Sequence, residues 1–194
     1  MIAEPTITRK DQILDAAERL FSERGYHATT IREIARELQL EGGSLYSHIS
    51  GKQELLYQIV LRGSTQFLRA AQATLAEGGP ARDQLLRFMR RHLAIVAESA
   101  PRAVVHFHEW RHLDAERQAE ICMRRDEYEG MLRQIIYAGV AGGEFTAADE
   151  RLIGLQVLSL LNWTYQWYAP GGTWSADDLA AQFFDLLMRG LEPR

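Results

Sequence analysis

The sequence predicts an all-α fold, and two observations carry this prediction. Apolar residues recur at helical spacing along nearly the whole chain, and no alternating β-branched run bounded by turn residues appears. In several places a Ser or Thr is followed three residues later by an acid or amide, directly before an apolar-periodic segment, which is typical of a helix N-terminus. These pairs are Thr30 with Glu33, Ser50 with Gln53, Thr146 with Asp149, and Ser175 with Asp178.

Three helices are expected before residue 52. The first covers residues 8–24 and ends at Gly25, because glycine readily adopts the left-handed conformation that stops a helix. Two short helices follow at residues 31–38 and 42–48. A longer helix followed by two short ones is typical of a three-helix helix-turn-helix, in which the last short helix enters the major groove of DNA.

The rest of the chain is predicted to form longer helices. One runs from Ser50 to a break at residues 78–80, and the others are separated by Pro and Gly. Their expected ranges are 81–98, 101–113, 115–141, 147–168 and 176–190. The helix at 147–168 is apolar on most sides, which favours contact with a partner subunit as well as its own core.

This pattern divides the chain into two predicted domains. Residues 1–52 form a DNA-binding domain, and residues 53–194 form a ligand-binding and dimerisation domain. We expect a homodimer through the helices at about 147–168 and 176–190.

Composition limits the other classes of protein. Cys122 is the only cysteine and cannot form an internal disulfide, and the N-terminal residues lack the apolar core of a signal peptide. The apolar run at residues 152–161 is too short and too polar to span a bilayer. We therefore expect a cytoplasmic protein with no membrane partner. The net charge of −4 gives no support to DNA binding, so that prediction depends on individual positions.

Three stretches within residues 8–60 resemble the signature of the TetR family of transcriptional regulators. They are TTIREIA at residues 29–35, GSLYSHI at 43–49 and KQELL at 52–56, with the spacing of that family. The resemblance implies a dimeric repressor that binds a palindromic operator and is not an enzyme. It further implies a two-state mechanism, in which ligand binding favours a spacing of the two recognition helices that no longer matches the operator.

The resemblance also implies which residues contact DNA. By position, Thr30, Tyr46, His48 and Lys52 correspond to phosphate contacts, and their donor chemistry suits that role. Ser44 and Ser47 are candidates for base edges, with Gly43 allowing close approach of the backbone. The complete expected set is Thr30, Arg32, Gly43, Ser44, Leu45, Tyr46, Ser47, His48 and Lys52. Glu41 and Gly42 depart from the family pattern, and Glu41 near phosphates is expected to weaken binding unless it caps the recognition helix or accepts from a cytosine amine.

The C-terminal half resembles one branch of the family, whose members regulate fatty-acid, steroid or aromatic-acid breakdown and respond to acyl-CoA thioesters. The residues that carry this resemblance include Glu109-Trp110, Tyr128 and Trp167-Tyr168. Independently, three arginines of one predicted helix border an apolar face, which suits an amphiphilic anion as well as a solvated surface. The expected effector-binding residues are Arg87, Arg90, Arg91, Phe107, Trp110, Tyr128, Trp163 and Trp167. A multidrug-binding repressor with a hydrophobic drug as its effector is the alternative.

One motif favours a different class of protein. His108-Glu109-Trp110-Arg111-His112 matches the zinc-hydrolase pattern, in which two His lie on one helix face and the Glu is a general base. No clear third protein ligand follows, so we expect neither a catalytic metal nor a cofactor beyond the small-molecule effector. A structural or regulatory metal at His106, His108 and His112 stays open, and Cys122 is expected to be an inert thiol.

Overall fold

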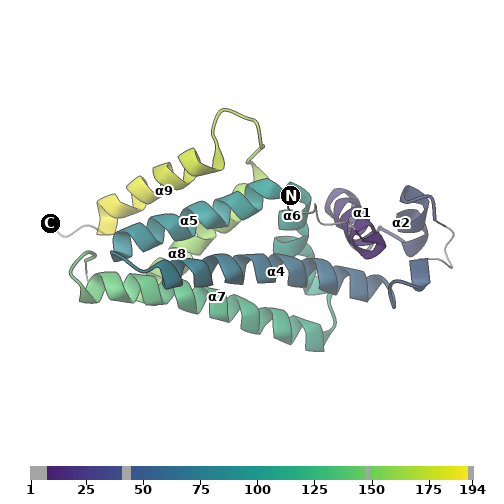
Figure 1. The fold of residues 1–194 in the computed structure, drawn as a ribbon, viewed down its shortest axis with the longest axis horizontal. Coiled ribbons are helices and arrows are strands. Elements are labelled where there is room, and N and C mark those ends of the chain that lie inside the picture. Colours follow the sequence, from purple (N-terminus) through teal and green to yellow (C-terminus); the bar gives the residue numbers. More distant parts are fainter. Residues whose placement is uncertain (1–7, 41–44, 147–148, 192–194) are drawn as a thin grey trace, which may run out of the picture. The chain divides into compact units, whose positions relative to one another are not determined.

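The computed structural model describes residues 8–40, 45–146 and 149–191, and within these ranges the regular secondary structure is entirely helical (Figure 1). The all-α prediction is therefore confirmed. The α-helices are α1 (Arg9–Arg24), α2 (Ile31–Glu37), α4 (Lys52–Glu77), α5 (Ala81–Glu98), α6 (Ala100–His108), α7 (Ala115–Ala141), α8 (Glu150–Asn162) and α9 (Ala176–Leu191). Two short 3₁₀ helices, η1 (Glu109–His112) and η2 (Trp163–Gln166), follow α6 and α8.

Two of the predicted capping pairs form the expected reciprocal hydrogen bonds. Thr30 accepts a hydrogen bond from the backbone N–H of Glu33, whose carboxylate accepts from the backbone N–H of Thr30. Ser175 and Asp178 bond reciprocally in the same way ahead of α9. These interactions satisfy N–H groups that a helix N-terminus leaves without an intrahelical partner.

The other two predicted starts are wrong. Asp149 itself caps α8 by accepting from the N–H of Leu152, while the Thr146 hydroxyl donates to the Leu191 carbonyl. The long helix begins at Lys52, and the Gln53 amide bonds residues of another segment instead of a Ser50 cap. In both cases a partner distant in sequence competes successfully for the side chain.

Two predicted helices end earlier than their periodicity indicates. The helix expected at 101–113 leaves the α conformation after His108 and continues as η1. The helix expected at 147–168 ends at Asn162 and continues as η2, where the Thr164 hydroxyl donates to the Leu161 carbonyl over 2.6 Å. Such a local side-chain bond competes with the regular helical pattern.

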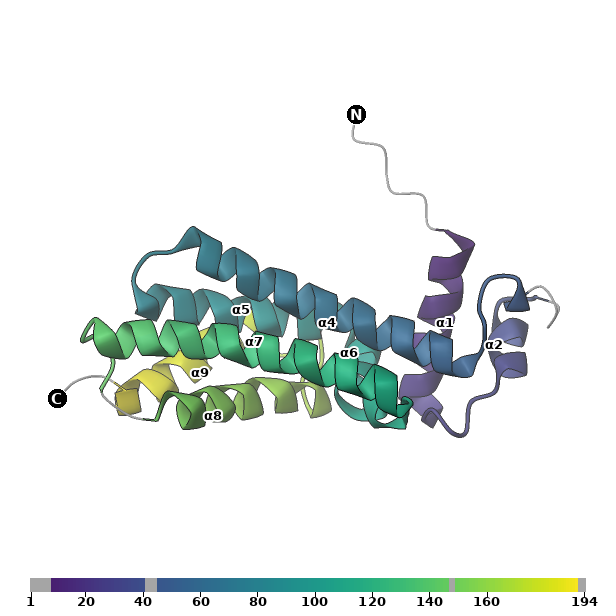
Figure 2. The same ribbon diagram turned by 90° about the horizontal axis from the view of Figure 1, so that it is seen from below.

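The chain folds into two compact units that differ from the predicted domains. The first unit contains residues 1–63 together with 101–121, and the second contains 64–100 together with 122–194. Figure 2 shows α4 and α7 along their length, and each of these helices contributes residues to both units. Segment 101–121 thus belongs structurally with the N-terminal helices, although it lies far from them in sequence.

The first unit has its own apolar core. Phe21 of α1, Ile34 of α2 and Leu56 of α4 are fully buried there. Val105, Leu113 and Ile121 of segment 101–121 complete this core.

The core of the second unit is formed mainly by α5, α7, α8 and α9, and α5 packs closely along α9 (Figure 1). Gly139 of α7 allows the ring of Phe145 to fold back on the helix, since a Cβ at residue 139 would lie 2.2 Å from that ring. Among the described residues, no helix is long and apolar enough to cross a membrane.

Candidate nucleic-acid interface

The segment at residues 45–49 presents polar groups outward and apolar groups inward. Leu45 and Ile49 are buried in the core of the first unit. Tyr46 is 59% exposed, and Ser47 and His48 are also exposed. Burial of two residues four apart anchors this helical turn and leaves the side chains between them available for a partner.

Gly43 and Ser44, with Glu41 and Gly42, lie outside the described residues. The Leu45 side chain is fully buried, so it packs in the core and does not belong to the exposed surface.

The start of α2 presents Thr30 and Arg32, both of which are exposed. The Thr30 hydroxyl donates to the Glu33 carboxylate over 2.8 Å, and the hydrogen bonds from Thr30 lower the pKa of Glu33. A phosphate that accepted from this hydroxyl would therefore compete with an ionised carboxylate.

Lys52, at the first turn of α4, is held against the turn that follows α1. Its ammonium donates to the His27 carbonyl over 3.3 Å and lies 4.2 Å from the centroid of the Tyr26 ring. Desolvation lowers the pKa of Lys52, while the carboxylates of Glu33 and Glu109 oppose this change. The ammonium is thus fixed in position, as a phosphate contact requires.

A hollow of about 360 Å³ lies beside the exposed segment. Lys10 of α1 lines it together with Tyr46, Ser47 and His48. Lys10 was not among the predicted contacts, because it falls outside the three stretches that resemble the family signature. Its position in the first turn of α1 was the only available signal.

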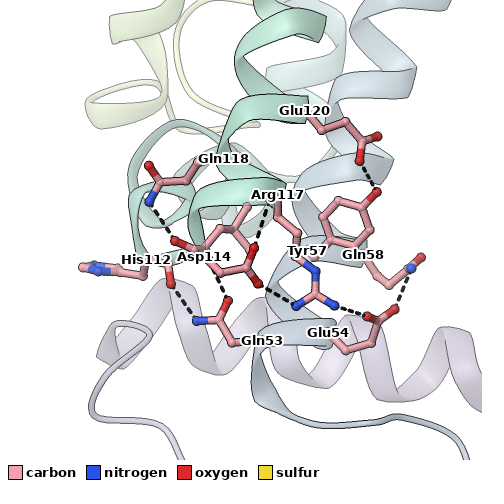
Figure 3. A network of polar contacts seen from close by, with 10 residues as sticks. Gln53, Glu54, Tyr57, Gln58, His112, Asp114, Arg117, Gln118 and Glu120 are labelled. Carbon is pink, nitrogen blue, oxygen red and sulfur yellow. Dashed lines mark hydrogen bonds and ion pairs between the residues drawn. The ribbon is translucent and has the colours of Figure 1, made fainter.

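The start of α4 is held by a network of polar contacts from segment 101–121 (Figure 3). The Gln53 amide donates to the His112 carbonyl over 2.7 Å and accepts from the N–H of Asp114 over 3.2 Å. The next residue, Glu54, pairs with Arg117 at 2.9 Å. The hydroxyl of Tyr57 donates to Glu120 over 2.6 Å. This network fixes the helix that carries Lys52.

Two further contacts join segment 101–121 to the N-terminal helices. The Arg102 guanidinium donates to the Glu18 carboxylate of α1 over 3.0 Å, and both side chains are nearly buried. The backbone N–H of Tyr26 donates to the Glu109 carboxylate over 2.9 Å. The helix-turn-helix is therefore one structural unit with a segment that follows it by many residues.

The zinc-hydrolase motif does not have the predicted geometry. His108 ends α6, whereas Glu109 and His112 belong to η1, so the two His do not share one α-helical face. The ring of His106 is buried and its Nδ1 lies 3.3 Å from the Val60 carbonyl oxygen. Within the described part of the chain, no group of three or more His, Cys, Asp or Glu residues is placed to hold a metal.

The three arginines expected to bind an effector are paired with carboxylates of the second unit. Arg87 and Arg91 both contact Glu77, and Arg90 lies 2.8 Å from Asp177. An anionic ligand would therefore compete with these acids.

The aromatic residues predicted to bind an effector are distributed over both units. Phe107 and Trp110 belong to the first unit, while Tyr128 packs against the core of the second. Trp163 is 62% exposed and Trp167 is 47% exposed.

A polar pair lies inside the second unit and was not predicted as a pair. The Nδ1 of His92 is 2.9 Å from the hydroxyl of Tyr128, next to the rings of Phe67 and Phe88. Desolvation lowers the pKa of His92 to about 3 and raises that of Tyr128 well above its ordinary value. Both groups are therefore neutral at neutral pH.

An exposed helical turn that carries Tyr, Ser and His, packed against two further helices with a fixed ammonium beside it, is characteristic of a helix-turn-helix DNA-binding protein. The chain belongs to the tetR family of bacterial regulatory proteins. The N-terminal family model matches residues 13–59, and the model described as "Tetracyclin repressor-like, C-terminal domain" matches residues 78–191. The family resemblance found in the sequence is confirmed, and this family consists of transcriptional regulators, not enzymes.

The similarity to known proteins extends over nearly the whole chain. The transcriptional repressor KstR2 of Rhodococcus jostii is 28% identical over 185 residues, covering 94% of this chain and 91% of the relative. The crystal structure of the regulator PfmR from Thermus thermophilus has a TM-score of 0.88 and 36% identity, covering 94% of this chain and 100% of that one. The structure of AibR in complex with isovaleryl coenzyme A and operator DNA has a TM-score of 0.85 and 25% identity, with coverages of 94% and 100%.

Proposed function

We propose that this protein is a homodimeric transcriptional repressor that binds a palindromic operator in the cytoplasm and is released from it by an acyl-CoA. The observation that carries the DNA-binding part is the exposed face of Tyr46, Ser47 and His48 above the buried Leu45 and Ile49. This arrangement presents a short helix of donors on a firmly packed scaffold.

In the proposed complex, positively charged and hydroxyl groups bind phosphates around the recognition helix. Lys10, Tyr46, His48 and Lys52 have suitable chemistry and lie on three neighbouring elements of the first unit. Ser47 and the sequence-predicted Ser44 and Gly43 are assigned to the base edges. Thr30 and Arg32 extend the phosphate contacts to the start of α2.

The dimer is assigned to α8 and α9. Leu152, Leu155 and Trp163 recur along one exposed face of α8 and its continuation, and Leu186 is 65% exposed on α9. Large apolar side chains gathered on two helices are characteristic of a surface that another subunit covers. A two-fold dimer would present two recognition helices to the two halves of a palindrome.

The effector is assigned to the second unit. AibR is similar in fold over most of the chain, and its structure contains isovaleryl coenzyme A together with operator DNA. An acyl chain needs apolar surroundings, at about 0.8 kcal/mol for each buried CH₂, and a phosphorylated head needs cations. Arg87, Arg90 and Arg91 are the proposed cations, with Glu77 and Asp177 as the groups to be displaced.

Release from DNA follows from a shift between two states. The effector must bind the DNA-incompetent state more tightly, by roughly 5.5 kcal/mol for a nearly complete switch. α4 is the proposed lever, because it carries Lys52 at its start and contributes its later residues to the second unit.

The proposal is tested by fluorescence anisotropy with labelled duplexes from the region around the protein's own gene. We expect binding of a palindromic duplex by a dimer, with an affinity that falls steeply as salt rises. Acyl-CoAs of graded chain length should then release the duplex, while free CoA and free acids do so poorly. Salt-independent DNA binding, or no binding to any fragment, would contradict the assignment as a repressor. Release of the duplex only by neutral or cationic hydrophobic drugs would contradict the acyl-CoA effector and favour the multidrug-binding repressor.

A further inference from the structure

The rings of His27 and His112 meet at the surface of the first unit. His27 lies in the turn between α1 and α2, and His112 ends η1, 85 residues later. The Nε2 of His27 is 3.0 Å from the Nδ1 of His112, and the ring centroids are 4.3 Å apart. Two imidazole nitrogens at this distance share a single proton or bind a common cation.

The separation of the nitrogens fits a metal ion. Two imidazole nitrogens bound to one tetrahedral zinc at about 2.0–2.1 Å lie about 3.3 Å apart. The observed N–N distance of 3.0 Å is close to this value, and the two rings, whose centroids are 4.3 Å apart, would turn so that both lone pairs face the ion. Both side chains are exposed, so solvent can supply the remaining ligands of the ion.

The cluster is also held in place by its surroundings. The Lys52 ammonium bonds the carbonyl of His27, and the Gln53 amide bonds the carbonyl of His112, so consecutive residues of α4 fix both backbones. The ring of Tyr26 lies nearly parallel to that of His112 at 5.7 Å. Figure 3 shows the His112 ring pointing away from the polar network that its backbone joins.

A carboxylate faces the other nitrogen of His112. The Oε2 of Glu109 lies 3.6 Å from Nε2 of His112 and accepts from the N–H of Tyr26. A carboxylate behind a coordinating imidazole is a common arrangement in metal sites, because it stabilises the polarised ring and orients it. Lys52 is the positive charge that opposes the ion, and Glu33 and Glu109 are the negative charges that interact with Lys52.

We propose that His27 and His112 form a binding site for a divalent transition-metal ion, with Glu109 as a positioning residue. Nitrogen ligands without a thiolate suit Zn²⁺, Cu²⁺ and Ni²⁺. When the ion binds, the proton between the two rings moves to the other nitrogen of the same imidazole, so that two neutral rings each present a lone pair to the metal. With two protein ligands the ion is exchangeable and differs from the buried, catalytic zinc that the His108–His112 motif would have required.

The ion would join the turn after α1 to η1. It would restrain the helix-turn-helix against segment 101–121 at the point where Glu109 already bonds Tyr26. Because the ion binds the folded arrangement, it should raise the temperature of thermal unfolding in a concentration-dependent manner.

The test is calorimetric titration of the untagged, chelator-treated full chain with Zn²⁺ at pH 7.5. We expect one ion per chain, with the affinity falling at pH 6 because both ligands must be deprotonated. His27→Ala and His112→Ala should each weaken binding by more than about tenfold, since even outer-shell changes cost roughly 10 to 100-fold. Glu109→Gln keeps an oxygen for Tyr26 and should weaken binding by about tenfold.

His108→Ala is the matched control, because His108 belongs to the same sequence motif but ends α6. Its Zn²⁺ affinity should equal that of the wild type. Electron paramagnetic resonance of bound Cu²⁺ should show imidazole nitrogens in the wild type and lose one in His27→Ala, with circular dichroism checking that each variant is folded. Equal affinity in wild type and the His27→Ala, His112→Ala double variant, or loss of the ion in His108→Ala, would overturn the proposal. DNA binding does not enter this test.

Discussion

The carboxylate of Glu18 and the guanidinium of Arg102 lie 3.0 Å apart in the first unit, with side chains only 6% and 11% exposed. This ion pair connects α1 with α6, and removal of one partner would leave the other charge buried. Arg102→Met should therefore lower the free energy of unfolding by about 3–5 kcal/mol, measured by urea denaturation.

A surface pair provides the control for this prediction. Arg19 and Glu37 also meet, at 2.6 Å, but their side chains are 47% and 39% exposed. Arg19→Met should cost less than about 1 kcal/mol, because exposed pairs are screened by water. A similar decrease in the free energy of unfolding in both variants would show that burial does not make the Glu18–Arg102 pair more important for stability than an exposed pair.

Phosphate contacts should be separable from base contacts. Tyr46→Ala and Lys52→Ala should weaken binding to all DNA sequences, and Lys52→Ala should also reduce the slope of log affinity against log salt by about one. Ser44→Ala and Ser47→Ala should change the preference among operator variants. Anisotropy titrations at several salt concentrations measure both effects, and Tyr137→Ala, an exposed tyrosine of α7, is the control that should leave binding unchanged.

The apolar face of α8 and α9 should control subunit association. Replacement of Leu152 and Leu186 by Glu would place charges on the proposed seam, so the double variant should be monomeric in analytical ultracentrifugation and bind a palindrome poorly. Met123 is 64% exposed on α7, and Met123→Glu should leave the mass unchanged. A dimeric Leu152→Glu, Leu186→Glu variant would place the interface elsewhere.

Acidification should destabilise the second unit through His92. Burial holds its folded-state pKa at about 3, below the ordinary value of 6.5, so the unfolded chain binds a proton that the folded chain does not. The contribution of neutral His92 to the free energy of unfolding is fully present above pH 6.5 and decreases as the pH falls toward 3. Between pH 7.5 and 5 the decrease is about 2 kcal/mol. Urea denaturation of His92→Gln should show a flatter dependence on pH than the wild type. His48→Gln changes an exposed ring and should follow the wild-type curve.

Removal of the arginines and removal of their acidic partner should have opposite effects on the response to the effector. Arg90→Ala with Arg91→Ala should weaken the response to acyl-CoA by roughly tenfold or more, because charged hydrogen bonds are lost. Glu77→Gln should strengthen it, since Arg87 and Arg91 would no longer pair with a carboxylate. Arg69 is exposed on α4, and Arg69→Ala serves as the control for net charge. If neither the arginine double variant nor Glu77→Gln changed the acyl-CoA concentration needed to release the operator, these arginines would be excluded from the effector site.

Local signals in the sequence were sufficient for the fold class and the helix-turn-helix. The start of α2 followed from Thr30 and Glu33, which interact over three residues. The break before η1 was not predictable in this way, because Glu109 bonds Tyr26, 83 residues earlier. The ion pair of Arg90 with Asp177 and the contact of His27 with His112 likewise depend on tertiary structure, whereas the apolar character of Leu45 already indicated that its side chain would be buried.

The inclusion of segment 101–121 in the first unit limits how this protein can be recombined with others. Val105, Leu113 and Ile121 complete the core beneath the N-terminal helices, so a fragment of residues 1–63 would expose the apolar surface that they cover. A chimera that exchanges only the N-terminal residues for those of another regulator would bring together two halves of a core that did not evolve together. Transplanting operator specificity therefore requires α6, η1 and the first turns of α7 to move with the recognition helix.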